Sequence, residues 1–152
     1  CTRFANVANS NGSVIPFWIS EAKKGNALKL TDPGMNRLMF SKKDSAELIW
    51  MAITSAAGIK TSFILCKLMK NVNLLELAKS LSDKEVEIIG KRPGEKLNET
   101  LISKKELPFT SVVDDGYVFI STEKQKNNLP QEHASSNAEW MSVTELEELV
   151  WD

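Results

Sequence analysis

Two arginines, one glutamate and one asparagine are the side chains whose types and positions best suit the binding of an anion. Arg37 follows a Thr-Asp-Pro turn and has apolar neighbours, and Arg92 and Glu95 flank a Pro-Gly corner. Asn6 follows an apolar stretch, where polar groups of α/β sheets meet ligands. A guanidinium group can bind a phosphate with two parallel hydrogen bonds, and a carboxylate can accept hydrogen bonds from ribose hydroxyls. The two arginines and the asparagine could therefore clamp a pyrophosphate while Glu95 accepts from a ribose. The alternative for Arg92 and Glu95 is an ordinary ion pair within a turn.

Composition excludes several other kinds of site. The 152 residues carry 19 Lys+Arg against 20 Asp+Glu, so we expect no nucleic-acid partner. No apolar stretch is long enough to span a membrane, and we expect no membrane partner and a cytoplasmic location. Two cysteines (Cys1 and Cys66) and one histidine (His133) predict neither a disulfide scaffold nor a metal site. We expect Cys66 to pack as a small apolar side chain and His133 to lie in a surface loop.

The pattern of apolar residues predicts an α/β fold in which short strands alternate with helices and some strands pair in parallel. The chain opens without methionine inside an apparent strand, which suggests a piece of a longer protein. Trp18 and Trp50 are expected in the core, and Trp140 and Trp151 are expected to anchor the last helix. Strands are predicted at 2–8, 27–30, 62–66, 86–89, 109–113 and 117–120, with a turn at 114–116 and a loop at 124–137. Helices are predicted to begin after Ser13, Ser41, Asn73, Glu95 and Ser142.

The sequence lacks the usual signatures of a catalytic centre. It has no glycine-rich loop between a strand and a helix, no G-x-S-x-G motif and no nucleophile near a recognisable base in the sequence. We therefore predict no catalytic residue within these 152 residues.

Four sequence blocks, taken in order, resemble a known family. They are Arg-Phe-Ala-Asn-Val (3–7), Gly-Ser-Val-Ile-Pro (12–16), Leu-Thr-Asp-Pro (30–33) with Met-Asn-Arg (35–37), and Gly-Lys-Arg-Pro-Gly-Glu-Lys (90–96) with Glu99. The run resembles the C-terminal half of the polysaccharide-biosynthesis branch of extended short-chain dehydrogenases/reductases. It is most similar to the inverting UDP-N-acetylglucosamine 4,6-dehydratases, whose tail resembles Asn-Ala-Glu-Trp-Met-Ser (137–142) and Glu-Leu-Glu-Glu-Leu (145–149).

The resemblance implies that residues 1–152 form the UDP-sugar-binding portion of a larger enzyme, with some Rossmann strands and a small α/β domain. Such enzymes use NADP or NAD to oxidise the sugar at C4, eliminate water across C5 and C6, and return the hydride to C6. The cofactor loop and the Tyr-x-x-x-Lys pair of the family are absent from this sequence. The chain alone is therefore expected not to convert a nucleotide-sugar substrate. Alternatives are a C4 epimerase, a retaining dehydratase, or a binding or interaction module without catalysis. The full-length protein is expected to be a homo-oligomer.

The resemblance also implies roles for single residues around the phosphates. Asn6, Arg37 and Arg92 would contact the UDP diphosphate, and Glu95 would contact the uridine ribose. Val7 would lie beside the nicotinamide end of the cofactor.

A second group would hold the rest of the nucleotide. Gly12, Ser13 and Val14 would open the helix that closes over it, and Leu28 and Leu30 would run beside the uracil. The sequence departs from the family in three places: Ala5 replaces a usual glycine, Asn-Ser-Asn-Gly (9–12) replaces a Gly-Ser-Arg-Gly type loop, and Asn-Arg-Leu (36–38) replaces Thr-Arg-Phe.

Overall fold

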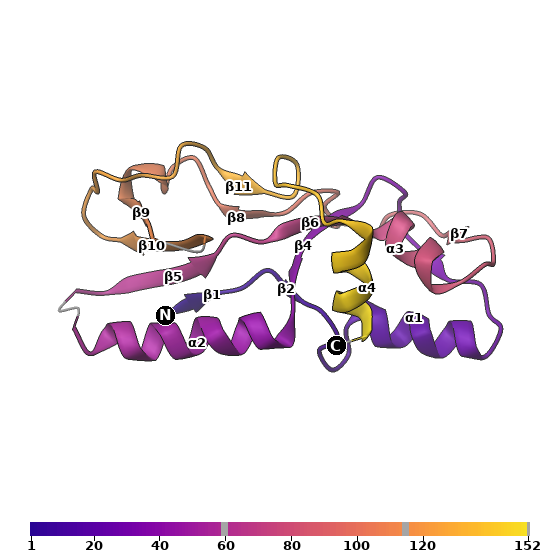
Figure 1. Ribbon diagram of the computed structural model, residues 1–152. Helices are drawn as coiled ribbons and strands as arrows, with labels where there is room; N and C mark the ends of the chain where they lie inside the picture. Colours follow the sequence, from indigo (N-terminus) through magenta and orange to yellow (C-terminus); the bar gives the residue numbers. More distant parts are fainter. Residues whose placement is uncertain (59–60, 114–115, 152) are drawn as a thin grey trace.

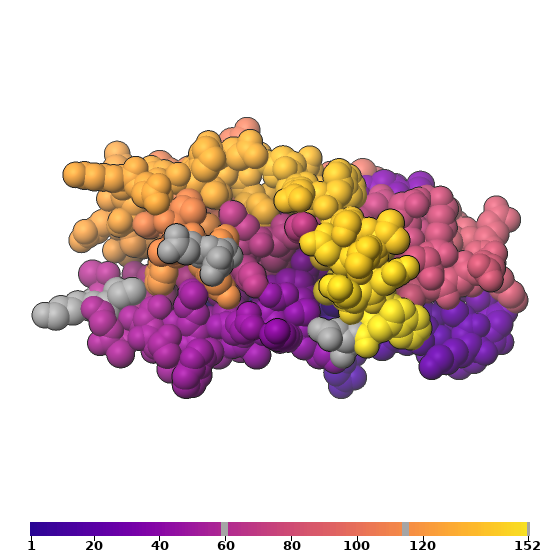
Figure 2. Space-filling model, viewed as in Figure 1, coloured from indigo at the N-terminus to yellow at the C-terminus, as the bar shows by residue number. Residues whose placement is uncertain are grey.

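The computed structural model describes residues 1–58, 61–113 and 116–151. Figure 1 shows an elongated arrangement of helices around small sheets, and the space-filling view has the same elongated outline (Figure 2). The largest sheet has the order β1-β5-β10-β9, in which β1 and β5 are parallel and the other pairs are antiparallel. Helix α2 (Lys42–Ala56) covers one face of it (Figure 1). The four strands are β1 (Thr2–Arg3), β5 (Phe63–Lys67), β9 (Thr110–Val112) and β10 (Tyr117–Ser121).

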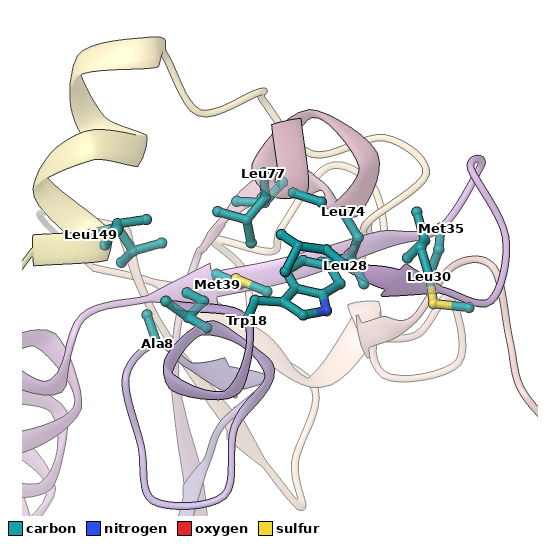
Figure 3. Close-up of a cluster of buried hydrophobic side chains, with 13 residues drawn as sticks. Ala8, Trp18, Leu28, Leu30, Met35, Met39, Leu74, Leu77 and Leu149 are labelled. Carbon is teal, nitrogen blue, oxygen red and sulfur yellow. The ribbon is translucent and has the colours of Figure 1, made fainter. Parts of the chain in front are cut away.

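A second sheet has the order β2-β4-β6 and lies next to the remaining helices. Strand β2 is parallel to β4, and β4 is antiparallel to β6. The core on this side includes Trp18, Met39, Leu77 and Leu149, which Figure 3 shows gathered between the sheet and the helices. The elements are β2 (Asn6–Val7), β4 (Asn36–Phe40), β6 (Lys70–Asn73), α1 (Val14–Lys23), α3 (Leu74–Leu81) and α4 (Val143–Trp151).

Two short strand pairs complete the described fold. Strand β3 (Lys29–Leu30) pairs in parallel with β7 (Glu87–Ile88), and β8 (Thr100–Ile102) pairs in antiparallel fashion with β11 (His133–Ala134). The 3-10 helix η1 (Leu107–Phe109) leads into β9. The α/β fold with parallel pairs is therefore confirmed.

Local signals in the sequence explain where the helices begin. The Ser41 hydroxyl accepts from the backbone N–H of Asp44 at 3.0 Å, and the Asp44 carboxylate accepts from the backbone of Ser41, which completes a capping box. The Asn73 side chain accepts from the first free N–H groups of α3. The predicted hairpin strands at β9 and β10 pair as expected, while Asp114 and Asp115 of the predicted turn lie outside the described residues.

Two predicted elements are wrong. The helix expected after Glu95 is absent, and β8 forms instead because the β-branched residues of 100–102 pair with β11. The segment before β8 is not helical, and its carbonyls bind β4, as in the 2.9 Å bond from the Asn36 N–H to the Leu97 oxygen. The loop expected over 124–137 contains β11, and His133 is half-buried there. Its Nε2 lies 3.0 Å from the N and 2.9 Å from the O of Met69, and burial lowers its pKa.

Three tryptophans also differ from expectation, while Trp18 and Cys66 are buried as predicted. Trp50 is 68% exposed because α2 turns Leu48 toward the sheet and leaves the opposite face uncovered. Trp140 and Trp151 are 57% and 72% exposed, so neither anchors α4. The buried side chains of Leu149 and Val150 hold that helix instead.

The uncovered face of α2 predicts self-association of the isolated chain. Ile49, Trp50 and Ile53 form an exposed apolar strip on the face of α2 that points away from the sheet, and β1 is an edge strand of that sheet. Contiguous exposed apolar surface and open strand edges both favour association. We expect light scattering to show oligomers of the wild type, fewer of a Trp50→Gln/Ile53→Gln variant, and no change for the control Glu47→Gln. A monomeric wild type at high concentration would contradict this.

The ion pair between Arg3 and Glu106 predicts acid sensitivity. The Glu106 carboxylate accepts from Arg3 Nη2 at 2.7 Å and from the N–H and hydroxyl of Ser103, and these partners, Arg3 first, lower its pKa to about 2. Because the folded pKa lies below the ordinary value of 4.5, the stabilisation is present above that value and is lost as the pH falls toward 2. Urea unfolding should show Glu106→Gln less stable than the wild type at neutral pH. The gap should shrink in acid, and a constant gap would refute the assignment.

Candidate functional site

An open pocket of about 820 Å³ lies where the loop after β2, the start of α1, strands β3 and β4 and the loop after β7 meet. Its volume is within the usual range for sites that take a nucleotide-sized ligand. Ten residues were proposed from the sequence for ligand and cofactor contacts, and nine of them line this pocket. They are Asn6, Val7, Gly12, Ser13, Val14, Leu30, Arg37, Arg92 and Glu95.

Arg37 is fixed in place by the backbone around it. Its Nη1 donates to the carbonyl oxygens of Asn36 at 2.8 Å, Lys96 at 3.0 Å and Leu97 at 3.2 Å. Its Nε lies 3.3 Å from the Glu99 carboxylate, and the side chain is 13% exposed. Among the described residues, Nη2 makes no hydrogen bond, so this edge of the guanidinium is available to a ligand. The side chain is pre-organised, so it has little rotamer freedom to lose on binding.

Glu99 connects Arg37 to Asn6. One carboxylate oxygen of Glu99 faces Arg37 Nε, and the other accepts from Asn6 Nδ2 at 2.9 Å. Asn6 Nδ2 also donates to the Leu38 carbonyl at 3.0 Å, so both amide protons of this side chain are engaged. The side-chain oxygen of Asn6 is the atom left to meet a ligand, which suits a hydroxyl or amide donor better than a phosphate oxygen.

Arg92 and Glu95 come from the corner after β7 and face the same pocket as Arg37. The Glu95 carboxylate accepts from the backbone N–H of Arg92 at 3.1 Å. This bond is the main cause of a lowered Glu95 pKa, and the nearby Thr31 hydroxyl and the charges of Arg92 and Arg37 lower the pKa further. Glu95 is therefore ionised at neutral pH and has both guanidinium groups near it. Arg37 on β4 and the corner that carries Arg92 and Glu95 therefore line one pocket.

The N-terminus of α1 opens into this pocket. Ser13 is the N-cap residue, its hydroxyl makes no cap hydrogen bond, and its Oγ is buried without a partner among the described residues. Gly12 has φ +77°, and a Cβ added there would meet nothing within 4 Å. The first N–H groups of a helix have no partner within the helix and carry a partial positive charge, which favours an anion here.

Leu28 is the proposed residue that does not line the pocket. Its side chain is 1% exposed and belongs to the core, and its carbonyl accepts from the Glu87 N–H at 2.9 Å. Leu30 does line the pocket, and Phe17 and Ile89 lie on it as well, 59% and 45% exposed. The apolar wall of the pocket is therefore built from α1, β3 and the segment after β7.

Sequence reasoning left Phe17 and the bridging role of Glu99 unassigned. An aromatic residue one position after Ile-Pro in a short helix looks like core, and only the orientation of α1 shows that Phe17 faces the pocket. Glu99 was part of a matched sequence block, but its two partners lie more than 60 residues away in the chain.

Over the described residues, no group of three or more His, Cys, Asp or Glu side chains could hold a metal ion. In that same part of the chain, no helix combines the length and apolarity needed to cross a bilayer.

The family model described as "Polysaccharide biosynthesis protein" matches residues 1–122, which include every lining residue of the pocket. The chain belongs to this family. As a member, it is 31% identical over 167 aligned positions to a protein named UDP-glucose 4-epimerase from Rickettsia rickettsii, covering 98% of this chain and 48% of the relative. It is also 36% identical over 137 positions to an uncharacterised membrane protein of Methanocaldococcus jannaschii, covering 83% of this chain and 41% of the other.

A solved structure supports the fold of this family member. The X-ray structure of Pen from Bacillus thuringiensis is similar with a TM-score of 0.80 and 26% identity, covering 98% of this chain and 46% of that one. The chain thus spans about half the length of the proteins it matches. Fold and family are those of the extended short-chain dehydrogenases/reductases that include nucleotide-sugar epimerases.

Proposed function

We propose that the pocket at the start of α1 binds the UDP part of a nucleotide sugar, UDP-N-acetylglucosamine. The observation that carries the proposal is the arrangement of Arg37, Arg92 and Glu95 around one pocket, next to the helix N-terminus at Ser13. Arginines bind phosphate oxygens with geometric specificity, and a helix N-terminus adds N–H donors and a favourable field. Two guanidinium groups and one helix N-terminus match the charge of a diphosphate, and Glu95 is placed to accept from a ribose hydroxyl.

The apolar wall would take the base. Phe17 and Ile89 offer an exposed apolar surface to the uracil ring, and Leu30, although only 3% exposed, lines the same wall. Leu28 would act through its backbone alone, because its side chain is in the core. The relatives named UDP-glucose 4-epimerase support a UDP-sugar as the ligand.

The reaction proposed for the whole protein is NADP- or NAD-dependent 4,6-dehydration with inversion at C5, in the biosynthesis of a surface polysaccharide or a nonulosonic acid. The cofactor would accept a hydride from the sugar and return it. Val7 lines the pocket and fits a contact with the cofactor's nicotinamide end, and most of the cofactor site would lie in the half that the relatives have beyond this chain. The residues of this chain would bind and orient the nucleotide. We propose no proton transfer by any of them.

A C4 epimerase is the second candidate, and the names of several relatives favour it. The experiment is to incubate the full-length protein that contains this chain with UDP-N-acetylglucosamine and NADP or NAD, and to analyse the product by NMR. A 4-keto-6-deoxy sugar would support the dehydratase, and a 4-epimer would support the epimerase. UDP binding by the chain without either product would point to a binding module. No binding of UDP would overturn the proposal.

A further inference from the structure

The loop between β2 and α1, residues 9–12, carries a contact that the proposed ligand site does not itself require. Asn9 begins this loop and adopts φ +54°, a left-handed conformation that glycine adopts more readily than other residues. Its Nδ2 donates two hydrogen bonds, to the carbonyl oxygens of Leu149 at 2.9 Å and Val150 at 3.0 Å. One side chain therefore joins the start of the pocket loop to the last turn of α4, 140 residues away in the chain.

The contact closes the end of α4. The last carbonyls of a helix have no partner within it, and α4 has no basic residue in its last turn. The Asn9 amide supplies two of the missing donors. Ala8, the preceding residue, is 3% exposed and packs in the same apolar cluster as Leu149 and Val150 (Figure 3). Apolar packing at Ala8 and the hydrogen bonds of Asn9 therefore both attach the start of the loop to α4.

Helix α4 is itself fixed at its other end. Glu145 and Ser142 form a reciprocal cap there, with the Ser142 N–H donating to the Glu145 carboxylate at 2.8 Å. The Lys70 ammonium donates to the same carboxylate at 2.7 Å and ties the helix to β6. Figure 1 shows α4 running down to the loop between β2 and α1, where the chain end lies. Helix α4 therefore connects the β2-β4-β6 sheet, through Lys70, to the loop between β2 and α1.

We infer that Asn9 is a positioning residue: by tying the pocket loop to α4, it holds the N-terminus of α1 and the Ser13 hydroxyl in register with the phosphates. The loop is short, and its turn is closed by the bond from the Ser13 N–H to the Ser10 carbonyl at 3.0 Å. A shift of the Asn9 backbone would therefore also shift Ser13. A loop that is ordered before the ligand arrives has less conformational entropy to lose on binding. The inference rests on the proposed binding of UDP.

The test uses Asn9→Gly, because glycine keeps the left-handed backbone without strain and removes the side chain with its two hydrogen bonds, at the cost of a more flexible backbone. The matched control is Asn11→Gly, in the same loop, at an exposed side chain that makes no hydrogen bond within the described part of the chain. NMR titration of the isotope-labelled 152-residue chain gives the affinities for UDP and for uridine, including weak ones. Asn9→Asp is a second variant, which keeps the side-chain size but turns a carboxylate toward the two carbonyls.

We expect Asn9→Gly to weaken UDP binding by about fivefold, with uridine binding unchanged. Asn9→Asp should weaken it at least as much, and Asn11→Gly should bind like the wild type. Equal loss for UDP and uridine would indicate a merely structural role and overturn the inference, as would an unchanged UDP affinity of Asn9→Gly beside a binding wild type. If the wild type binds no UDP, the proposed function fails and this role fails with it.

Discussion

Replacing Arg37 by alanine is expected to weaken UDP binding by about 10- to 100-fold, the range that corresponds to one lost charge-assisted hydrogen bond or pair. Arg37 brings its guanidinium to the pocket already held by three carbonyls and by Glu99, so the wild type loses little entropy on binding. The substitution also leaves the Lys96 carbonyl without its donor and the Leu97 carbonyl with the Asn36 N–H alone, and the corner that carries Arg92 and Glu95 should loosen. Both effects lower the affinity.

Two companion variants separate these effects. Arg37→Lys keeps the charge but cannot reproduce the fork of donors, so it should recover only part of the affinity. Arg92 is exposed and has no partner in the described part of the chain for its guanidinium, so Arg92→Ala should cost affinity without destabilising the fold. Isothermal calorimetry with UDP and thermal unfolding by circular dichroism measure both quantities. An Arg37→Ala chain that is folded and binds UDP like the wild type would refute the role of Arg37.

Replacing Trp18 by alanine is expected to destabilise the fold by about 3–5 kcal/mol, the usual cost of removing a large buried aromatic side chain. Trp18 is 2% exposed and packs in the cluster with Leu28, Leu30 and Leu77 (Figure 3). Its indole Nε1 donates to the Lys29 carbonyl at 3.2 Å, which joins α1 to β3 directly beneath the pocket. A cavity at this position would therefore weaken the packing of α1 and of β3, which both line the pocket.

The measurement is urea unfolding, followed by the far-ultraviolet circular dichroism of the chain. Trp18→Phe serves as the matched variant, because it keeps an aromatic ring but loses the hydrogen bond and some volume, and its cost should be clearly smaller. Trp50→Phe, at an exposed tryptophan of α2, should cost almost nothing. A loss below about 1 kcal/mol for Trp18→Ala would show that this side chain is not a main support of the core.

The parts of the fold that sequence alone predicted are those determined by neighbours in the chain. The caps at Ser41 and Asn73 work within three residues, and the helices begin where these signals stand. Strands β4 and β6 were not predicted, because their stability comes from pairing with each other across 30 residues or more rather than from a strand-like pattern. Trp50 shows a related limit: helical spacing identifies an apolar face, but α2 has a second such face at Leu48, and only the packing shows which one is covered.

In the candidate site, too, features set by neighbouring residues could be predicted, and features set by distant contacts could not. Turn signals placed Arg92 and Glu95 at a corner and Arg37 just after a turn, where the structure has the start of β4. The resemblance to a family gave the three residues a common ligand, so their position around one pocket could be expected. The bridge that Glu99 makes between Asn6 and Arg37 depends on the relative placement of three distant segments. No local pattern reports such an arrangement. The same is true of the contact between Asn9 and α4.

The most direct test of the central claim is to compare the affinities of this chain for UDP and for uridine, in the wild type and in Arg37→Ala/Arg92→Ala. If the two guanidinium groups and the N-terminus of α1 bind the diphosphate, the wild type should bind UDP much more tightly than uridine, and the double variant should lose most of that preference while its uridine affinity stays the same. A wild type that binds the two ligands equally, or a double variant that keeps the full preference for UDP, would contradict it.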